Sequence, residues 1–331
     1  MQAIAQLRRM LTESRKSLYD RINRLKKEKN VVVLAHYYMS PELQLSTAEG
    51  GCADFLGDSL GLSLEAQKTN AENIMFCGVR FMAETALIVS PDKKVFMPDV
   101  SSGCSLASSI SAKDIIELRK KYPGLPVMGY INTYAETKAE LDICCTSRNA
   151  VSIAGSLDSD KIIFVPDIFM GQNLKEAISK KYNKDLILWN GTCEVHEQFR
   201  NETMNVSDDA DVEMLMHWEV PGDTAREQLK IRKGVVGSTG DILNYVKNSN
   251  AKKFYLASEC DLGESLKKSN ADKEFITPCI KCPYMKQNTL EKLLASLESI
   301  GTDTEDQYRI TLDAHIIERA RIPVLKMLQF N

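Results

Sequence analysis

The stretch Val31-Val32-Val33-Leu34-Ala35 decides the fold class of this chain of 331 residues. It is short, continuously apolar and rich in β-branched side chains, a pattern typical of a strand buried on both faces of a parallel sheet. Neighbouring parallel strands are joined by crossover connections, which are usually α-helices. The stretch therefore predicts an α/β protein with parallel sheets.

Passages of the same kind recur along the chain. The first strand of each passage ends in a polar or aromatic cluster, and the clusters are His36-Tyr37-Tyr38, Tyr130-Ile131-Asn132 and His217-Trp218-Glu219. A small polar turn then precedes a helix, at Gly57-Asp58-Ser59, Thr146-Ser147-Arg148-Asn149 and Gly237-Ser238-Thr239-Gly240. Further strands are expected at residues 74–77, 162–165 and 254–257. The pattern predicts three copies of one α/β unit, each about 90 residues long.

These copies define the expected architecture. We predict three three-layer αβα units with parallel sheets, related by a pseudo-threefold axis around a central active site. The expected ranges are 1–106 with an N-terminal amphipathic helix, 107–195, 196–285, and a C-terminal helical segment, 286–331, that packs back on the body and is interrupted near Pro323. Ligands of open α/β sheets bind beyond the carboxyl ends of the strands, where the polar clusters lie.

Three cysteines occupy equivalent places in the repeat. Cys104, Cys193 and Cys282 are separated by 89 residues each time, and each follows an apolar run and a polar or glycine break. A threefold repeat would bring the thiols together. Structural zinc and electron-transfer iron–sulfur clusters usually take four protein ligands, so three distant thiols suggest an incomplete shell. A cubane cluster held by three cysteines keeps one iron open as a Lewis acid for a substrate oxygen.

The cysteines also have plainer interpretations. The three thiols would equally suit small buried positions at equivalent strand ends, since free cysteine is often buried. Cys279 and Cys282 form a C-x-x-C pair that fits half a zinc site or a redox couple. The other five are expected to fill core or surface positions, and they are Cys52, Cys77, Cys144, Cys145 and Cys260.

Ionisable and hydroxyl residues gather at the same strand ends. Three of the four histidines, His36, His196 and His217, lie at or just beyond predicted strand ends, where imidazole can move protons near neutral pH. Glu219 follows His217 by two residues, so in an extended segment both side chains leave on one face. That spacing fits a proton-transfer pair or a solvated edge. The hydroxyl residues of the turns fit helix caps or a site for phosphate and carboxylates.

Composition limits the class of protein. An apolar content of 44% supports full cores, and Lys+Arg 42 against Asp+Glu 45 gives a net charge of −3 without long blocks of one sign. Binding to nucleic acid or to an anionic membrane has no support in this balance. Residues 1–30 resemble neither a signal peptide nor a membrane span. Nine cysteines without a secretion signal favour a reducing compartment, so we expect a cytoplasmic protein with a small ligand.

Several motifs together carry a resemblance to a known family. They are Ala35-His36-Tyr37-Tyr38 with Pro41-Glu42, Gly57-Asp58-Ser59-Leu60, residues 76–85 (FCGVRFMAET), Gly103-Cys104-Ser105-Leu106-Ala107, residues 145–150 (CTSRNA), Gly237-Ser238-Thr239-Gly240 and Cys282-Pro283-Tyr284-Met285-Lys286. With these motifs the chain, from about Val31 to Phe330, closely resembles the quinolinate synthases, the NadA-type or quinolinate synthetase A family of de novo NAD biosynthesis.

The resemblance implies a reaction and a cofactor. Members are transferases that condense iminoaspartate with dihydroxyacetone phosphate to quinolinate, releasing phosphate and water. They use a [4Fe–4S] cluster, whose ligands here would be Cys104, Cys193 and Cys282. The resemblance also implies functional coupling to the L-aspartate oxidase that produces iminoaspartate, and a need for the cluster-assembly machinery.

The site residues follow from the same resemblance. The site would be lined by His36, Tyr38, Ser59, Tyr130, Asn132, Ser147, His196, His217, Glu219, Ser238 and Thr239. The residues with catalytic roles would be His36, Tyr38, His217 and Glu219, of which Tyr38 and the His217/Glu219 pair would move protons. The hydroxyl turns and His36 would hold phosphate and carboxylates. Tyr130 and Asn132 would position the intermediate.

The chain departs from the family pattern locally. Where many members read His-Pro-Glu-Cys, this chain has His217-Trp218-Glu219-Val220, which keeps the ionisable pair and changes the loop around it. Cys279, present in only some members, suggests a reversible disulfide with Cys282 that would disable the cluster. The competing hypothesis is a zinc- or cluster-binding structural or electron-carrier protein built from three repeated domains. Four ligands would favour that protein, and three favour the enzyme.

Overall fold

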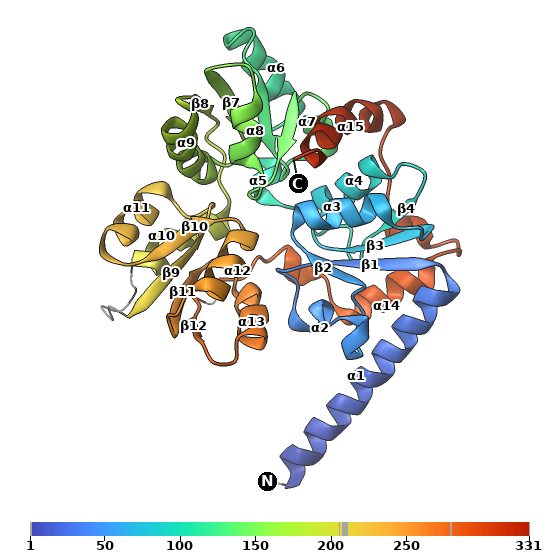
Figure 1. Ribbon diagram of the computed structural model, residues 1–331. Helices are drawn as coiled ribbons and strands as arrows, with labels where there is room; N and C mark the ends of the chain where they lie inside the picture. Colours follow the sequence, from blue (N-terminus) through green and yellow to red (C-terminus); the bar gives the residue numbers. More distant parts are fainter. Residues whose placement is uncertain (1, 205, 207–210, 279, 331) are drawn as a thin grey trace. The chain divides into compact units, whose positions relative to one another are not determined.

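The chain folds as an α/β protein with three predominantly parallel sheets, in line with the prediction from its apolar runs (Figure 1). The computed structural model describes residues 2–204, 206, 211–278 and 280–330. By contacts the chain divides into two compact units, Met1–Ser102 with Pro283–Thr311 and Gly103–Cys282 with Leu312–Asn331. The first unit contains one sheet and the second contains two.

The sheet of the first unit has the strand order β13-β4-β3-β1-β2. Its strands are β1 (Val31–His36), β2 (Phe55–Gly57), β3 (Asn73–Cys77), β4 (Lys94–Phe96) and β13 (Arg309–Ile310). Every residue of β1 is buried, which is why the run of branched apolar residues is continuous. Only β13 is antiparallel, and it extends the sheet beside β4.

Helices cover this sheet and pack on one another. They are α1 (Gln2–Glu28), α2 (Pro41–Gln44), α3 (Ser59–Lys68), α4 (Arg80–Val89) and α14 (Leu290–Ser299), with the 3₁₀ turns η1 (Thr47–Glu49), η2 (Met285–Gln287) and η3 (Glu305–Gln307). The amphipathic α1 packs against α14 and β1, as expected for an appended helix. Lys26 of α1 is buried and pairs with Asp54 at 2.8 Å, which ties the helix to the segment before β2.

The second unit contains two sheets with the orders β6-β5-β7-β8 and β10-β9-β11-β12. The first comprises β5 (Val127–Tyr130), β6 (Ile143–Cys145), β7 (Lys161–Val165) and β8 (Asp185–Leu188). The second comprises β9 (Val212–His217), β10 (Gly234–Gly237), β11 (Lys253–Ala257) and β12 (Glu274–Ile276). All the strand pairings in these two sheets are parallel.

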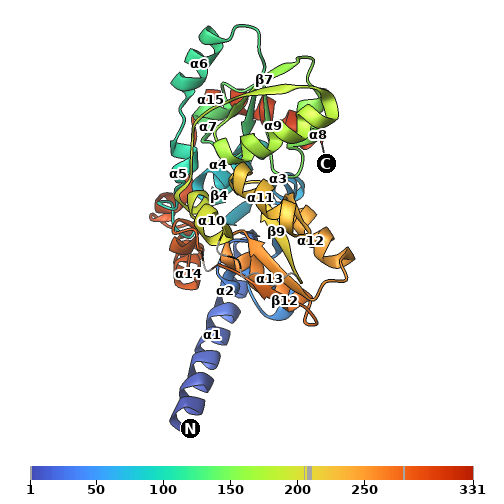
Figure 2. The ribbon, with the colours of Figure 1, turned by 90° about the vertical axis from the view of Figure 1, so that its left-hand side faces the viewer.

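The helices of the second unit lie beside both sheets. They are α5 (Ser105–Ser108), α6 (Ala112–Lys121), α7 (Ala135–Lys138), α8 (Ala150–Ser156), α9 (Ile168–Tyr182), α10 (Glu194–Met204), α11 (Gly222–Ile231), α12 (Thr239–Asn248), α13 (Cys260–Ser269) and α15 (Ala314–Leu328). The C-terminal α15 packs against α7 and β6 (Figure 2).

One hydrogen-bond pattern shows that the repeat is structural. In each sheet the residue after the first strand donates its backbone N–H to the last residue of the second strand. These bonds are Tyr37 to Gly57 at 3.1 Å, Ile131 to Cys145 at 2.8 Å and Trp218 to Gly237 at 3.0 Å. The backbone of each polar cluster is therefore held by the same hydrogen bond, at the carboxyl end of the first strand of its sheet.

Several local expectations need correction. The repeat contains a short second strand, β2, β6 or β10, before each polar turn, and no such strand was expected. The helix α15 continues through Pro323 because tertiary packing buries its flanking residues, including Ala320 and Val324. By contacts, α14 belongs to the first unit and α15 to the second. The domain boundaries given above stay predictions.

The caps of the helices after the turns differ from one another. Ser238 caps α12 and forms a capping box with Asp241, as expected. At α3 the cap is Asp58, whose carboxylate accepts a hydrogen bond from Gly61 N at 2.8 Å, while Ser59 is the first helical residue. At α8 the N-cap position is held by Asn149 without a side-chain cap bond. The caps predicted at Ser59 and at the Thr146–Ser147 turn are therefore wrong.

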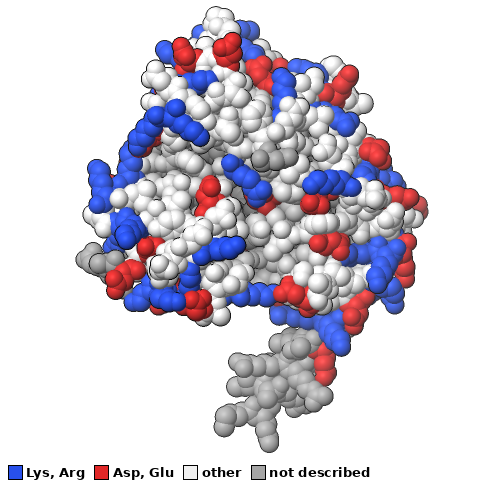
Figure 3. All heavy atoms as spheres, viewed as in Figure 1, with Lys and Arg blue, Asp and Glu red and all other residues white. Residues whose placement is uncertain are grey.

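Charged side chains are interspersed on the face drawn in Figure 3, where blue Lys and Arg residues lie among red Asp and Glu residues. Within the described part of the chain, no helix is both long enough and apolar enough to cross a membrane.

Candidate active site

A buried cluster of polar side chains lies where β5 and β9 end in the second unit. Tyr130 is the last residue of β5, and β9 ends at His217, two residues before Glu219. The Tyr130 hydroxyl donates a hydrogen bond to Glu219 Oε1 at 2.7 Å. Glu219 Oε2 lies 3.2 Å from His196 Nε2 and 2.9 Å from His217 Nδ1, the latter contact without hydrogen-bond alignment. Glu219 is therefore the centre of a cluster whose four members are all buried.

The loop that carries Glu219 is held in place by its backbone. The side-chain amide of Asn173 in α9 donates to the carbonyls of Trp218 and Val220, at 2.8 and 2.7 Å. Trp218 also pairs with Gly237 through its own N–H. Val220 is fully buried. The altered loop sequence thus leaves the Glu219 carboxylate inside the cluster.

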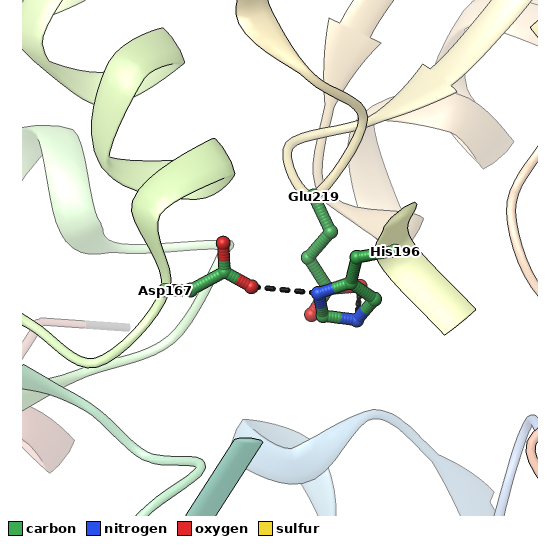
Figure 4. A group of neighbouring side chains, drawn as sticks. All are labelled: Asp167, His196 and Glu219. Atoms are coloured by element: carbon green, nitrogen blue, oxygen red, sulfur yellow. Dashed lines mark hydrogen bonds and ion pairs between the residues drawn. The ribbon is translucent and has the colours of Figure 1, made fainter. Parts of the chain in front are cut away.

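A second carboxylate lies on the other side of the His196 ring. Asp167 Oδ2 is 2.7 Å from His196 Nδ1, and Figure 4 shows this contact, with the Glu219 side chain close to the same ring. His196 belongs to α10, while Asp167 is the N-cap residue of α9. Each ring nitrogen of His196 therefore faces a different carboxylate.

The electrostatics of the cluster favour the charged forms of both partners. Burial by itself lowers the pKa of His196, but the charges of Glu219, Cys193 and Asp167 outweigh it and raise that pKa well above the ordinary value. Burial alone would raise the pKa of Glu219, and His196 and His217 together hold it well below its usual range. These two directions together favour an imidazolium beside a carboxylate in this buried site.

This cluster has the composition of a metal site but not its geometry. One ligand atom from each of Asp167, His196 and Glu219 lies within 4.8 Å of the others. The ring nevertheless turns Nδ1 to Asp167 and Nε2 to Glu219, so each nitrogen is engaged by a different carboxylate. A single ion needs its ligands to converge on one point. The arrangement is a hydrogen-bonded row in which protons can be held and passed.

The three repeated cysteines all belong to the second unit. Cys104 lies at the N-cap position of α5, Cys193 directly precedes α10, and Cys282 follows β12. Burial, together with like charge on Cys193 and Cys282, raises the pKa of the Cys104 thiol to about 12. Ionisation of the Cys104 thiol therefore needs a cation nearby.

The donor set fits the expected iron–sulfur group. Metal-bound cysteine is a thiolate, and a bound cation supplies the charge that stabilises it. Ser105 hydroxyl lies 3.7 Å from Cys193 Sγ and also hydrogen-bonds Glu194, which links the start of α5 to the start of α10. The backbone N–H of Cys104 donates to the Tyr134 hydroxyl at 3.2 Å. Ser105 thus joins the segment that carries Cys104 to the segment that carries Cys193. Tyr134 holds the backbone of Cys104 in place.

The remaining cysteines behave as predicted. Cys52, Cys77, Cys144, Cys145 and Cys260 are buried. Burial raises the pKa of the Cys52 thiol to about 12, and the same holds for Cys144. They fill core positions. Cys279, and with it the predicted disulfide to Cys282, lies outside the described residues.

Other predicted site residues of the second unit lie at strand ends. The side-chain oxygen of Asn132 is buried and accepts no hydrogen bond from the described residues. Ser238 and Thr239 are buried at the start of α12, where Ser238 serves as the cap. Ser147 is partly exposed in the loop after β6. The orphaned Asn132 oxygen fits a role that a ligand would complete.

Three predicted residues lie in the first unit. His36 ends β1, and its ring meets that of Tyr38 edge to face, with centroids 4.7 Å apart. His36 Nδ1 accepts the backbone N–H of Tyr38 at 3.2 Å, and Lys286 Nζ donates to the Tyr38 carbonyl at 2.5 Å. Ser59 opens α3. Their roles stay predictions.

Sequence reasoning missed Asp167 and Glu194. Asp167 follows Pro166 at the end of β7 and caps α9, so its place beyond a strand end was a signal of the kind that identified the other clusters. Glu194 directly follows Cys193 and is exposed, and no pattern in the sequence distinguishes it from other surface acids.

Comparison with known proteins gives the family. The NadA family profile, described as quinolinate synthetase A protein, matches residues 20–329. The chain is 40% identical over 321 residues to the quinolinate synthase of Pyrobaculum aerophilum, covering 95% of this chain and 99% of the relative. It is 38% identical over 338 residues to that of Aquifex aeolicus, covering 99% of both chains, and 39% identical over 318 residues to that of Caulobacter vibrioides, covering 93% and 80%. The chain therefore belongs to the quinolinate synthetase A family.

Proposed function

We propose that this chain is a quinolinate synthase, a transferase that condenses iminoaspartate with dihydroxyacetone phosphate in de novo NAD biosynthesis. The observation that carries the proposal is the buried row of Tyr130, Glu219 and His196 in the compact unit that also contains the three thiols. Full-length similarity to proteins named quinolinate synthase supports it.

The reaction balances without an oxidant. One carbon–carbon and one carbon–nitrogen bond form between the two substrates, and phosphate and two molecules of water leave. The ring becomes aromatic through these eliminations, so the chemistry consists of proton removal and proton delivery. Such a reaction needs acids and bases whose charges are held by their surroundings, as those of Glu219 and His196 are.

The protein side chains divide this work. The Glu219 carboxylate is held ionised and accepts protons, and it orients the Tyr130 hydroxyl through the 2.7 Å bond. His217 Nδ1 lies 2.9 Å from the same carboxylate, so the two groups of the proposed His217/Glu219 proton-transfer pair are neighbours. Asn132 offers its unpaired oxygen to position the intermediate. The N-terminus of α12, with Ser238 and Thr239, presents backbone N–H groups and a positive dipole end to anionic groups of the substrate.

The proposed cofactor is a [4Fe–4S] cluster held by Cys104, Cys193 and Cys282. When bound, it would supply an open iron that acts as a Lewis acid toward a substrate oxygen. Ser147 is proposed to bind an anionic group with the α12 residues. The roles of His36, Tyr38 and Ser59 rest on the family motifs alone.

Two partners follow from the chemistry. Iminoaspartate hydrolyses readily, so we propose functional coupling to the L-aspartate oxidase that forms it. The thiol site also requires the cluster-assembly machinery. No contact surface for either partner is assigned.

The function is tested by measuring both products under anaerobic conditions. The iron-loaded chain, given iminoaspartate and dihydroxyacetone phosphate, should release quinolinate and phosphate in equal amounts. Cys193→Ser should abolish both, while Cys52→Ser, which changes a buried thiol of the first unit, should keep them. A colourless zinc protein without turnover would instead support the structural or electron-carrier alternative.

A further inference from the structure

Asp167 lies outside the motifs that carry the family resemblance, yet it holds a ring of the candidate active site. It is fully buried, with 0% of its surface exposed. Its two carboxylate oxygens have different partners. Oδ1 accepts the backbone N–H groups of Phe169 and Met170, at 2.8 and 2.9 Å, while Oδ2 meets His196 Nδ1 at 2.7 Å.

The backbone around Asp167 is fixed as firmly as its side chain. Asp167 forms a parallel bridge with Gly191, in which Ile168 N donates to the Gly191 carbonyl at 2.9 Å and Gly191 N donates to the Pro166 carbonyl at 3.1 Å. Gly191 lies just before the segment that leads into α10. Backbone hydrogen bonds therefore fix the Asp167 segment relative to the segment that leads into α10, in addition to the side-chain contact with His196.

The contact between Asp167 and His196 determines whether ring atom Nδ1 carries a hydrogen. An ionised carboxylate can only accept hydrogen bonds, so a hydrogen bond between Asp167 Oδ2 and His196 uses a hydrogen on Nδ1. With Nδ1 engaged, Nε2 is the ring atom that faces Glu219, at 3.2 Å. The ring of Phe199 stacks on that of His196 at a centroid distance of 6.2 Å.

We propose that Asp167 is a positioning residue that fixes the His196 ring and keeps a hydrogen on Nδ1, so that Nε2 faces Glu219. The effect of Asp167 on turnover rests on the proposed function. The effect of Asp167 on the hydrogen at His196 Nδ1 does not. Asp167 touches His196 and its own helix, so it acts on the reaction only through His196.

Asp167→Asn tests the proposal because it preserves the cap and reverses the contact with the ring. The Asn oxygen can still accept from Phe169 and Met170. Its amide nitrogen would then face His196 Nδ1 as a donor, which requires Nδ1 to give up its hydrogen. The chain has four histidines, so nitrogen-15 labelling of histidine gives a spectrum of four rings, and His196→Gln identifies the relevant one.

The expected result at neutral pH is a change of state at one nitrogen. In the cluster-free full-length chain, the Nδ1 signal of His196 should be that of a protonated nitrogen, and in Asp167→Asn it should move to the position of a non-protonated nitrogen. In the iron-loaded chain, kcat/KM for quinolinate formation should fall roughly tenfold or more, about 1.4 kcal/mol. Asp313→Asn, which changes a cap carboxylate that accepts from His315 N, should alter neither.

Each outcome decides between distinct claims. An unchanged Nδ1 signal in Asp167→Asn would overturn the inference, and so would a moved signal with unchanged turnover. If the signal moves but the wild-type chain makes no quinolinate, the contact is established and the proposed function fails. Asp167→Ala, which removes both the cap and the ring contact, should show loss of stability in addition to the loss of turnover.

Discussion

The bond between Tyr130 and Glu219 is expected to be worth a measurable share of turnover. It spans 2.7 Å between two buried side chains, with 5% and 4% of their surfaces exposed, and its acceptor is charged. Hydrogen bonds to charged groups contribute about 1.5–3 kcal/mol. Because about 1.4 kcal/mol is a factor of ten, Tyr130→Phe should lower kcat/KM roughly 10- to 150-fold.

A double-mutant cycle separates this bond from other effects. Glu219→Gln removes the acceptor charge and the contacts to both histidines, so it should cost more than Tyr130→Phe. The double variant should be no worse than Glu219→Gln alone, because residues that act as a unit are not additive. The assay is anaerobic quinolinate formation, with iron content measured for each variant. Tyr122→Phe, at the end of α6, is the matched control and should retain full activity.

Additive losses in the two single variants would contradict a functional bond between Tyr130 and Glu219. If the two losses multiply, so that the coupling free energy is below about 0.5 kcal/mol, Tyr130 and Glu219 act independently. The proximity of the two groups would then be structural rather than functional.

Three further predictions concern charge, capping and the loop. The lowered pKa of Glu219 should stabilise the fold fully above pH 4.5, its ordinary value, and this stabilisation should be lost as the pH falls through the lowered pKa. The raised pKa of His196 should stabilise the fold fully below pH 6.5, and this stabilisation should be lost as the pH rises through the raised pKa. Urea midpoints of wild type and the His→Gln and Glu→Gln variants against pH would show this, and parallel curves would contradict it. Ser238→Ala should cost about 1 kcal/mol of unfolding free energy through its cap, while Ser59→Ala should cost under about 0.5 kcal/mol; equal losses would argue against the capping assignment. Asn173→Ala should leave two carbonyls unpaired and cost about 1–3 kcal/mol, with a fall in kcat/KM, and unchanged turnover would show that the loop keeps its place without it.

The repeated fold could be predicted from the sequence because its long strands carry strong patterns. Val31–Ala35 is apolar throughout since both faces of β1 are buried, and the later strands at residues 74–77, 162–165 and 254–257 all formed. The short strands β2, β6 and β10 could not be found, because three or four residues are too few to show a periodicity. Their pairing depends on the strand beside them.

Local competition explains the errors in the caps. Asp58 and Ser59 are both good cap residues and lie next to each other, so composition alone does not choose between them. The helix begins one residue earlier than expected, which leaves the Ser59 hydroxyl inside the first turn. Pro323 is a similar case. The sequence shows a proline that destabilises a helix interior, but it does not show the packing of α15 on β6 and α7.

The candidate site was predictable where the repeat marks it. Equal spacing identified Cys104, Cys193 and Cys282, and all three lie in one compact unit. The contact of Tyr130 with Glu219 joins residues from two sheets, so no spacing within either sheet predicts it. The domain boundaries and the cofactor stay predictions.

Iron and acid-labile sulfide per chain, measured after anaerobic reconstitution, show directly whether the three cysteines hold a cluster. The wild-type chain should contain about four irons and four sulfides, as in a [4Fe–4S] cluster. Both should be lost in Cys104→Ser, Cys193→Ser and Cys282→Ser, and both should be fully retained in Cys144→Ser, whose thiol is buried in β6. Zinc in place of iron, or a full cluster in any of the three ligand variants, would contradict the proposed ligand set.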